Sequence, residues 1–441
     1  MIRSAVVIAG GKGTRMAEAF PGLCKPMIPI DGKPVIERLI ETYSRQGIKR
    51  FLITIGHLGH QIRDHLGDGG RYGVSIDYFE ETRPLGTAGA FPALKSWINE
   101  PSFFVLYADT VGDVDLARMS AFHLVTGADA TILVHPNDHP YDSDLIELTS
   151  DDRVAVVHAK PHPGELEVRN LVNGALYLVN LSVLPLIPDG EAVDFGRDLL
   201  PVWAKQLRIY GYRSPEYLKD MGSPRRRAEV EAAVRSGKVS RRNMTNRQIA
   251  VFLDRDGVIN EHNGLVANPA ELKLIPGAAD AIHRLNCSDL LTVVVSNQSV
   301  VARGLTDEQG VERIHARMER MLAEESGAFL DDILFCPHHP DGGYPEENPR
   351  YKMVCDCRKP GAGMLLAAAR RFNIDLSSSV MIGDSVSDIQ AGIAAGVRLC
   401  IKIGAKWSED KKSAVGVVSV ACLADAVDWL LSEGLHRQVR A

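Results

Sequence analysis

Short apolar runs rich in β-forming residues alternate with helical patterns along this chain, and the series starts twice. The first half holds the runs 5–9, 51–55, 74–79, 103–107 and 130–134, with helical patterns such as 35–46 and 57–66 between them. The second half holds the runs 249–253, 290–295, 379–382 and 397–403. This alternation predicts parallel sheets with helices on both faces. We therefore expect two α/β domains, each a doubly wound sheet.

The length of the chain also requires more than one core, because chains split into domains beyond about 250–300 residues, and this one has 441. A polar, strongly basic stretch covers residues 223–247. We predict a first domain at 1–235, a basic linker at 236–247 and a second domain at 248–441. Residues 224–234 are expected to form a closing helix with proline in its first turn. A solvated helix and connector is the preferred interpretation of the basic stretch, and a phosphate- or partner-binding role is the alternative.

Composition excludes several classes of protein. Apolar residues make up 45% of the chain and charged residues 24%, which is typical of a globular protein. A net charge of −6 provides no overall field for a polyanion, so neither nucleic acid nor an acidic membrane is an expected partner. Apolar runs stay well below the roughly 20 residues that cross a bilayer, and a basic leader is not seen, so a cytoplasmic location is expected. A homo-oligomer remains open.

The first apolar run leads directly into Gly10-Gly11-Lys12-Gly13-Thr14-Arg15, and Lys25-Pro26 follows. Glycines let backbone N–H groups approach a phosphate closely, while Arg15 and Lys25 can neutralise its oxygens. The spacing differs from that of a Walker loop and of a dinucleotide-binding loop. A bare glycine turn after a strand is the alternative.

The whole string is more specific, and it resembles the sugar nucleotidyltransferase family that includes mannose-1-phosphate guanylyltransferases and glucose-1-phosphate thymidylyltransferases. Further motifs of that family follow in order up to about residue 235: 85–90, Asp109, Lys160-Pro161, 173–177 and 220–224. The resemblance implies a Rossmann-like domain in which catalytic Arg15 and Lys25 hold a nucleoside triphosphate together with the glycine loop. It further implies base- or sugar-proximal contacts from Gly86 and Thr87, sugar phosphate and sugar contacts from Lys160 and Asn173, and Mg²⁺ ligands at Asp109 and Asp220.

The implied chemistry needs these residue types, because two anions must be brought together in line when a sugar 1-phosphate attacks the α-phosphorus of a nucleoside triphosphate. Mg²⁺ prefers a few carboxylates together with phosphate oxygens and water. Three positions depart from the family pattern: Cys24, Ala108 and Ala159 stand where proline, glycine and glutamate are common. Ala159 removes a sugar-hydroxyl contact, so the identity of the sugar stays open.

In the second half, the run 249–253 ends in Asp254-Arg255-Asp256. Two carboxylates spaced by two residues at a strand end project to the same side, so one can attack phosphorus while the other handles the leaving-group proton. A polar strand-to-loop junction is the alternative. The later motifs 296–297, 358–360 and 383–388 complete a resemblance to the haloacid-dehalogenase superfamily of phosphatases over about residues 248–410.

That resemblance implies roles for individual residues. Asp254 is the nucleophile and Asp256 the general acid and base, and the expected Mg²⁺ ligands are Asp254, Asp256 and Asp384. Asp388 is expected to steady the magnesium shell or the lysine. The implied substrate-binding residues are Ser296, Asn297, Arg303, Arg358 and Lys359.

A Cys/His pattern narrows the subfamily. Cys336, His338, Cys355 and Cys357 offer three thiolates and an imidazole, which suit tetrahedral zinc. Reduced core cysteines near a surface histidine are the alternative. A zinc ion without an open position is expected to be structural and to fix the loop that ends in Arg358-Lys359. The order of motifs resembles heptose-1,7-bisphosphate 7-phosphatases, and histidinol-phosphate phosphatases are the nearest alternative.

Taken together, the resemblances imply a bifunctional enzyme. It would hydrolyse the 7-phosphate of D-glycero-D-manno-heptose 1,7-bisphosphate and transfer a nucleotidyl group, with GTP the favoured donor, to heptose 1-phosphate. One alternative pairs a nucleotidyltransferase for another sugar 1-phosphate, using GTP, UTP or ATP, with a histidinol-phosphate-like or broad sugar phosphatase. In the other, one half serves only as a binding or regulatory module. The base and the heptose anomer are left open.

Overall fold

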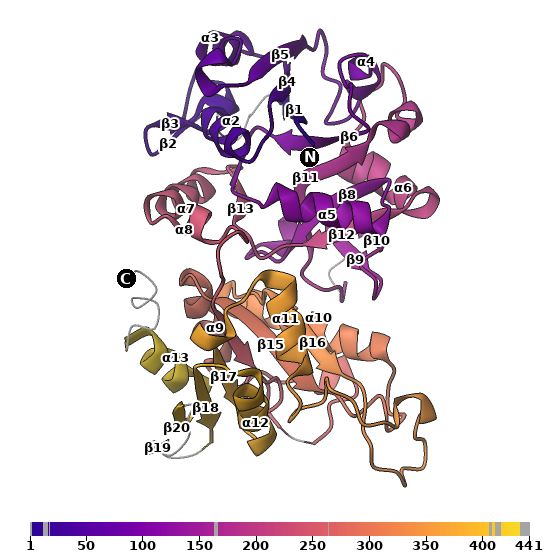
Figure 1. The fold of residues 1–441 in the computed structure, drawn as a ribbon, viewed down its shortest axis with the longest axis vertical. Coiled ribbons are helices and arrows are strands. Elements are labelled where there is room, and N and C mark those ends of the chain that lie inside the picture. The colour runs from indigo at the N-terminus through magenta and orange to yellow at the C-terminus, as the bar shows by residue number, and fades with distance from the viewer. Residues whose placement is uncertain are drawn as a thin grey trace. The chain divides into compact units, whose positions relative to one another are not determined.

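The computed structural model describes residues 2–11, 16, 18–162, 166–262, 264–404, 408–410 and 416–432. The chain forms two compact units (Figure 1). The first unit contains 1–135, 143–161 and 172–243, and the second contains 136–142, 162–171 and 244–441. Two short stretches from the first half of the sequence thus belong to the second unit.

The first unit is built on a nine-stranded sheet. Its strands are β1 (Ser4–Ala9), β4 (Arg50–Ile55), β5 (Ser75–Glu80), β6 (Ser102–Tyr107), β8 (Ala130–His135), β9 (Leu145–Leu148), β10 (Val154–His158), β11 (Val172–Asn180) and β12 (Ile209–Arg213). The main path runs β10-β9-β11-β6-β1-β4-β5, and β8 joins β11 to β12. The expected parallel pairs β1–β4, β1–β6 and β4–β5 are present. Strand β11 pairs antiparallel with β6 and β8, which was not expected from the sequence.

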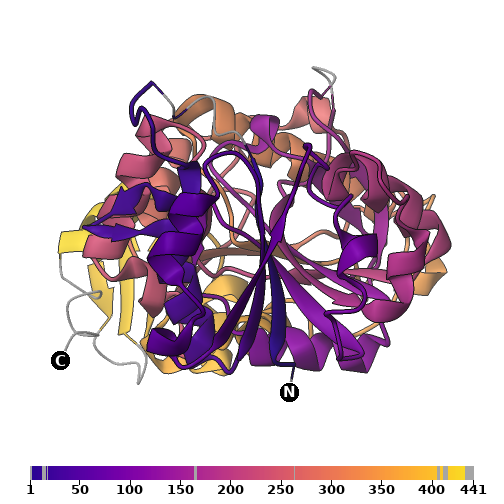
Figure 2. The same cartoon turned by 90° about the horizontal axis from the view of Figure 1, so that it is seen from above.

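Helices lie on both sides of these strands, as Figure 2 shows for the indigo and magenta segments. They are α2 (Val35–Arg45), α3 (His60–Leu66), α4 (Phe91–Leu94), α5 (Leu116–Thr126), α6 (Leu200–Gln206), α7 (Pro224–Arg235) and α8 (Lys238–Arg241). Two small antiparallel ladders complete the unit: β2 (Pro29–Ile30) with β3 (Lys33–Pro34), and β7 (Thr110–Gly112) with β13 (Leu218–Asp220). The second ladder brings together two segments that are distant in sequence.

Helix α7 begins at Pro224, as the sequence predicts, and its N-cap Ser223 accepts a hydrogen bond from the backbone of Arg226. Its basic side chains pair with nearby acids: Arg227 with Glu231 at 3.2 Å and Arg235 with the same Glu231 at 2.9 Å. These pairs favour the interpretation of a solvated helix for this part of the basic stretch.

The second unit is built on a seven-stranded sheet in the order β16-β15-β14-β17-β18-β20-β19. The strands are β14 (Ala250–Leu253), β15 (Leu291–Asn297), β16 (Asp332–Cys336), β17 (Val380–Gly383), β18 (Leu399–Ile403), β19 (Ser408–Asp410) and β20 (Gly416–Val420). Five neighbouring pairs are parallel, and β19 pairs antiparallel with β20. The four strands expected from the sequence form the centre of this sheet.

Both faces of the second sheet are buried. On one face, Val251 and Leu253 of β14 share a core with the helices α9 (Ala278–Cys287), α10 (Glu308–Ser326) and α13 (Leu423–Ser432). On the other face lie α11 (Gly363–Phe372) and α12 (Val386–Ala395), whose Gly392 packs against Met381 and Cys400. Burial on both faces explains why the strands appear in the sequence as continuous apolar runs. None of the helices in the described residues has both the length and the apolar character needed to span a bilayer.

A buried ion pair attaches the stretch 162–171 to helix α10 within the second unit. The Nε atom of Arg169 lies 2.8 Å from Glu319 Oε2, and its Nη1 lies 2.8 Å from Glu312 Oε2. Glu319 also accepts a hydrogen bond of 2.9 Å from the backbone N–H of Asn170. The Glu319 side chain is only 3% exposed, so its charge depends on these partners.

We expect Arg169→Met to destabilise the second unit by about 3 to 5 kcal/mol, because the variant leaves the charge of Glu319 buried without its partner. Chemical unfolding of the full chain measures this change. The double variant Arg169→Met with Glu319→Leu should recover much of the loss, since it leaves neither charge behind. An unfolding midpoint of the single variant equal to that of the wild type would contradict the importance of the pair.

Candidate functional sites

Three carboxylates and one ammonium group meet at the carboxyl ends of β14 and β17. Asp254 follows β14, Asp384 follows β17, and Asp388 lies in the first turn of α12. One oxygen of each lies within 4.8 Å of the others. The Nζ atom of Lys359 lies 2.8 Å from Asp254 Oδ1 and 2.6 Å from Asp388 Oδ1. Lys359 also donates a hydrogen bond of 2.7 Å to the carbonyl of Val295 in β15.

The charges of this group depend on one another. Burial lowers the pKa of Lys359, but the adjacent Asp254 and Asp388 outweigh it and raise the pKa above its usual value. Burial raises the pKa of Asp254 to about 6, against the opposing charge of Lys359. Three acids around one ammonium group leave net negative charge, and carboxylate oxygens are the donors that Mg²⁺ prefers. The residues present therefore fit a Mg²⁺ ion beside Asp254 and Asp384.

A glycine allows Asp384 to approach the loop that follows Asp256. Gly257 has a φ of +80°, which side-chain-bearing residues rarely adopt. A Cβ atom at this position would lie 2.1 Å from Asp384 Oδ2. The close approach of the β14 loop to Asp384 thus depends on the absence of a side chain.

Asp256 stands apart from the three-carboxylate group, and its oxygens accept hydrogen bonds from three side chains. Arg255 donates at 2.9 and 3.0 Å, Asn260 at 2.9 Å and Gln298 at 2.9 Å. Burial would raise the pKa of Asp256, but the charge of Arg255 and these hydrogen bonds lower it overall. The geometry suits an acid/base group held in a fixed orientation. Asn260 and Gln298 were not identified from the sequence as site residues, although Gln298 stands two positions after Ser296.

The end of β15 fixes the backbone of Lys359. Asn297 Nδ2 donates to the carbonyl of Lys359 at 3.0 Å, and the Lys359 N–H donates to Asn297 Oδ1 at 3.0 Å. Ser296 is buried, and its hydroxyl oxygen accepts a hydrogen bond of 2.8 Å from Gln298. The structure thus brings Ser296, Asn297 and Lys359 to one place. The guanidinium of Arg303, in contrast, lies 4.3 Å from the ring centre of Tyr344.

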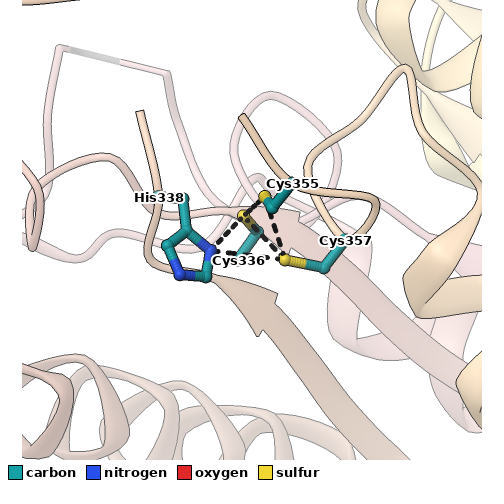
Figure 3. Close-up of side chains that lie close together, drawn as sticks. All are labelled: Cys336, His338, Cys355 and Cys357. Carbon is teal, nitrogen blue, oxygen red and sulfur yellow. Dashed lines mark hydrogen bonds between the residues drawn. The ribbon is translucent and has the colours of Figure 1, made fainter. Parts of the chain in front are cut away.

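Cys336, His338, Cys355 and Cys357 point toward one another (Figure 3). The sulfur of Cys336 lies 3.5 Å from that of Cys355, and the sulfur of Cys357 lies 3.2 Å from each of these two. The Nδ1 atom of His338 lies 3.6 Å from Cys336 and 3.4 Å from Cys357. A tetrahedral zinc with bonds of about 2.0–2.3 Å needs ligand atoms about 3.3–3.8 Å apart. The five separations given above lie between 3.2 and 3.6 Å, at the short end of this range or just below it.

This Cys/His cluster is connected through the chain to Arg358 and Lys359. Cys357 is followed immediately by Arg358 and Lys359. The Nη1 atom of Arg358 donates a hydrogen bond of 3.1 Å to the carbonyl of His338, so the two ends of the loop are joined. A metal bound by the cluster would therefore fix the backbone on which Lys359 stands.

In the first unit, the glycine loop follows β1 at Gly10 and Gly11. The expected phosphate-binding residues Gly13, Thr14 and Arg15 lie outside the residues that the structure describes. Lys25 begins a short 3₁₀ helix and forms an ion pair with Asp109, so two residues expected to hold the triphosphate and the metal are in contact.

The ladder of β7 and β13 brings Asp109 and Asp220 together. Asp220 is paired with Thr110, and the backbone N–H of Met221 donates to the carbonyl of Asp109 at 3.0 Å. Arg226 of α7 lies 3.1 Å from Asp220. The two aspartates expected to bind Mg²⁺ therefore occupy adjacent positions, with a lysine and an arginine beside them.

The remaining expected substrate residues lie around two further carboxylates. The Thr87 hydroxyl, next to Gly86, donates to Asp194 at 2.9 Å. The backbone N–H of Lys160 donates to Asp144 at 3.2 Å. Asn173, in β11, lies close to both carboxylates at Gly196. Asp144 and Asp194 were not identified from the sequence, because neither stands in one of the motifs noted there.

Comparison with known proteins matches the two halves of the chain to two different families. Residues 4–236 match the family model described as nucleotidyl transferase, and residues 356–406 match the model described as HAD-hydrolase-like. The D-glycero-beta-D-manno-heptose-1,7-bisphosphate 7-phosphatase of Rhodopseudomonas palustris is 42% identical over 151 residues, covering 34% of this chain and 81% of that protein. The protein of the same name from Photorhabdus laumondii is 40% identical over 184 residues, covering 41% and 95%.

The crystal structure of HddC from Yersinia pseudotuberculosis is also similar. It has 25% sequence identity and a TM-score of 0.46, and the match covers 53% of this chain and 100% of that chain.

The geometry at Gly257 generates a prediction. Gly257→Ala should lower phosphate release from a sugar phosphate by about 100-fold or more, because the added methyl group displaces Asp384 and a shift of about 1 Å at a reacting centre can cost that much. The matched control is Gly277→Ala, at a φ of +83° with open space around the added Cβ. It introduces the same backbone strain and should retain activity. Equal activity of the two variants, measured by phosphate release in folded protein, would contradict the proposed contact.

Proposed function

We propose that this chain, which belongs to the nucleotidyl transferase family through residues 4–236 and to the D-glycero-beta-D-manno-heptose-1,7-bisphosphate 7-phosphatase family through its second half, catalyses two consecutive reactions on one heptose. In the first, the 7-phosphate of D-glycero-D-manno-heptose 1,7-bisphosphate is hydrolysed. In the second, heptose 1-phosphate receives a nucleotidyl group and pyrophosphate is released. The observation that carries the proposal is the intact group of Asp254, Lys359 and Asp388, with Asp256 two residues after Asp254 in the chain.

In the phosphatase reaction, a carboxylate oxygen of Asp254 attacks phosphorus, and the bond to the sugar oxygen breaks. Asp256 gives a proton to that oxygen and then takes one from the water that hydrolyses the aspartyl phosphate. The approaching phosphate anion raises the pKa of Asp256, which prepares it to act first as an acid. Lys359 neutralises the phosphoryl oxygens. Asp254 and Asp384 would hold a Mg²⁺ ion, which adds further positive charge at the phosphoryl group when bound.

In the nucleotidyl transfer, an oxygen of heptose 1-phosphate attacks the α-phosphorus, and the bond to pyrophosphate breaks. Lys25, with Arg15, neutralises the triphosphate. Asp109 and Asp220 would hold Mg²⁺, which offsets the negative charge of the phosphates when bound. We propose GTP as the donor, because the family that the first half resembles includes guanylyltransferases and the two halves together resemble the enzymes of nucleotide-activated heptose synthesis. The order of the steps follows from the chemistry, because the phosphatase product is the acceptor of the transferase.

We also assign a structural zinc to Cys336, His338, Cys355 and Cys357. The distances between these ligand atoms support tetrahedral coordination, and the bond between Arg358 and His338 links the site to Lys359. Each of the seven cysteines is free of disulfide bonds. Free thiols and thiolate ligands fit a reducing compartment such as the cytoplasm.

The two reactions should be separable by mutation. Asp109→Asn should abolish formation of the nucleotide sugar from heptose 1-phosphate and GTP while phosphate release from the bisphosphate stays unchanged. Asp254→Asn should have the opposite effect, because it removes only the phosphatase nucleophile. Both reactions are measured on the same purified full chain. Loss of both activities in either folded variant would contradict two independent centres.

The zinc assignment predicts about one zinc ion per chain in freshly purified protein. Cys355→Ser should lower the zinc content and reduce phosphate release, because the loop before Lys359 loses its anchor. Cys287→Ser, at an exposed cysteine, is the control and should keep both zinc and activity. Elemental analysis measures the metal. Wild-type protein without zinc, or a Cys355→Ser variant with a full complement, would show that the cluster is a set of reduced cysteines.

A further inference from the structure

The position of Asp144 in the first unit bears on sugar recognition, which the sequence leaves open. Ala159 stands where the family commonly has a glutamate before Lys160-Pro161, so the contact from that glutamate to the sugar hydroxyls is missing. Asp144 precedes β9, and its Oδ1 accepts a hydrogen bond of 3.2 Å from the backbone N–H of Lys160. The acid thus lies directly beside the Lys-Pro motif but arrives from another strand.

Asp144 also faces the segment expected to bind the sugar. Its carbonyl accepts a hydrogen bond of 3.0 Å from the backbone N–H of Asn173. A Cβ atom added to Gly196 would lie 2.5 Å from Asp144 Oδ2, 3.3 Å from Asn173 Nδ2 and 3.5 Å from Asp194 Oδ1. The side chains of Asp144, Asn173 and Asp194 therefore converge at Gly196, where a side chain would collide with Asp144.

Asp194 connects this position to the loop of Gly86 and Thr87. Its Oδ2 accepts the hydrogen bond of 2.9 Å from the Thr87 hydroxyl, and its Oδ1 accepts one of 2.9 Å from the backbone N–H of Arg197. Asp194 is thus held by the protein on both oxygens. Asp144, in contrast, accepts the Lys160 N–H on Oδ1, and its Oδ2 is the atom nearest to a Cβ added at Gly196.

Tyr177 lies close enough to Asp144 and Asp194 for their negative charges to affect its pKa. Burial, followed by the charges of Asp194 and Asp144, raises the pKa of Tyr177, whose hydroxyl oxygen accepts a hydrogen bond of 2.9 Å from Asn173. A site with two carboxylates and an amide matches the hydrogen-bonding groups of a polyhydroxylated sugar, because each hydroxyl can donate to a carboxylate and charged acceptors form the stronger hydrogen bonds.

We propose that Asp144 determines sugar specificity in the nucleotidyl-transfer site, by accepting a hydrogen bond from a ring hydroxyl of the sugar 1-phosphate. Asp144 takes the place of the glutamate that is absent at position 159. Asp194 and Asn173 complete the surroundings of that hydroxyl. The inference rests on the proposed nucleotidyl transfer but not on the sugar being a heptose.

The test is steady-state kinetics of Asp144→Ala and Asp144→Asn in the full chain. Wild-type protein is first assayed with heptose 1-phosphate, mannose 1-phosphate and glucose 1-phosphate and each nucleoside triphosphate, and the best pair is used thereafter. Asp144→Ala should lower kcat/KM for that sugar 1-phosphate by about 10- to 100-fold, since a charged hydrogen bond is lost, and leave the KM of the nucleotide unchanged. Asp144→Asn keeps an acceptor oxygen, so its kcat/KM should lie between those of the wild type and of Asp144→Ala.

Deoxy analogues of the accepted sugar 1-phosphate identify the hydroxyl. Wild-type protein should discriminate strongly against one of them, and Asp144→Ala should reduce that discrimination to near one, because the polar group that would be left unpaired is gone. Asp189→Ala, at an exposed aspartate on the loop before Asp194, is the matched control and should behave as the wild type. Circular dichroism and thermal unfolding of each variant check that its first unit is folded.

The outcomes separate this inference from the proposed function. If wild-type protein prefers another sugar, the heptose assignment fails and Asp144 is tested on that sugar. If Asp144→Ala keeps both its kcat/KM for the sugar and its discrimination, or changes the KM values of sugar and nucleotide alike, the inference is overturned while nucleotidyl transfer stands. If no sugar 1-phosphate is accepted, both are wrong.

Discussion

The buried ammonium group of Lys359 is the interaction on which the phosphatase centre depends. Its side chain is only 1% exposed, and it lies between Asp254 and Asp388, whose charges would repel each other without it. A charge at this depth is stable only when its partners are in place. The structure provides them from several directions, with Asn297 fixing the Lys359 backbone and the Cys/His cluster fixing the residues immediately before it. The Cys/His cluster therefore acts on the proposed chemistry by fixing the position of the Lys359 ammonium group.

Much of this arrangement could be predicted from the sequence, because parallel sheets place chemistry at the ends of their strands. Asp254, Ser296 and Asp384 each follow an apolar run, and the carboxyl ends of neighbouring parallel strands meet at one edge. The spacing of Cys336, His338, Cys355 and Cys357 likewise predicts a metal site. Four ligands of one metal ion must lie close together, and these four side chains do. Where a residue's role follows from its place on a strand or from the demands of a metal, the sequence suffices.

Other features depend on contacts between segments that no local pattern connects. Nothing near Asp144 predicts that it lies beside Lys160, since that contact follows from the pairing of β9 with β10 and β11. Strand β11 was not among the strands expected from the sequence, and its antiparallel pairing with β6 and β8 likewise depends on contacts between distant segments. Gln298 was given no role from the sequence, since its hydrogen bond to Asp256 depends on how the chain turns after β15. The stretch 162–171 could not be assigned to the second unit without knowing that Arg169 meets Glu319.

The two centres solve the same electrostatic problem with different chemistry. Each is proposed to bind phosphate groups, and each holds a lysine against an aspartate, Lys25 with Asp109 in one and Lys359 with Asp254 in the other. Such pairs keep the charged groups oriented before the substrate arrives, so little reorganisation is needed at the moment of reaction. The difference lies in the second carboxylate. Asp256, held by three donors two residues after Asp254, is proposed to move protons during hydrolysis. Such an acid is unnecessary in the proposed nucleotidyl transfer, because the attacking sugar phosphate is already anionic and pyrophosphate departs as an anion.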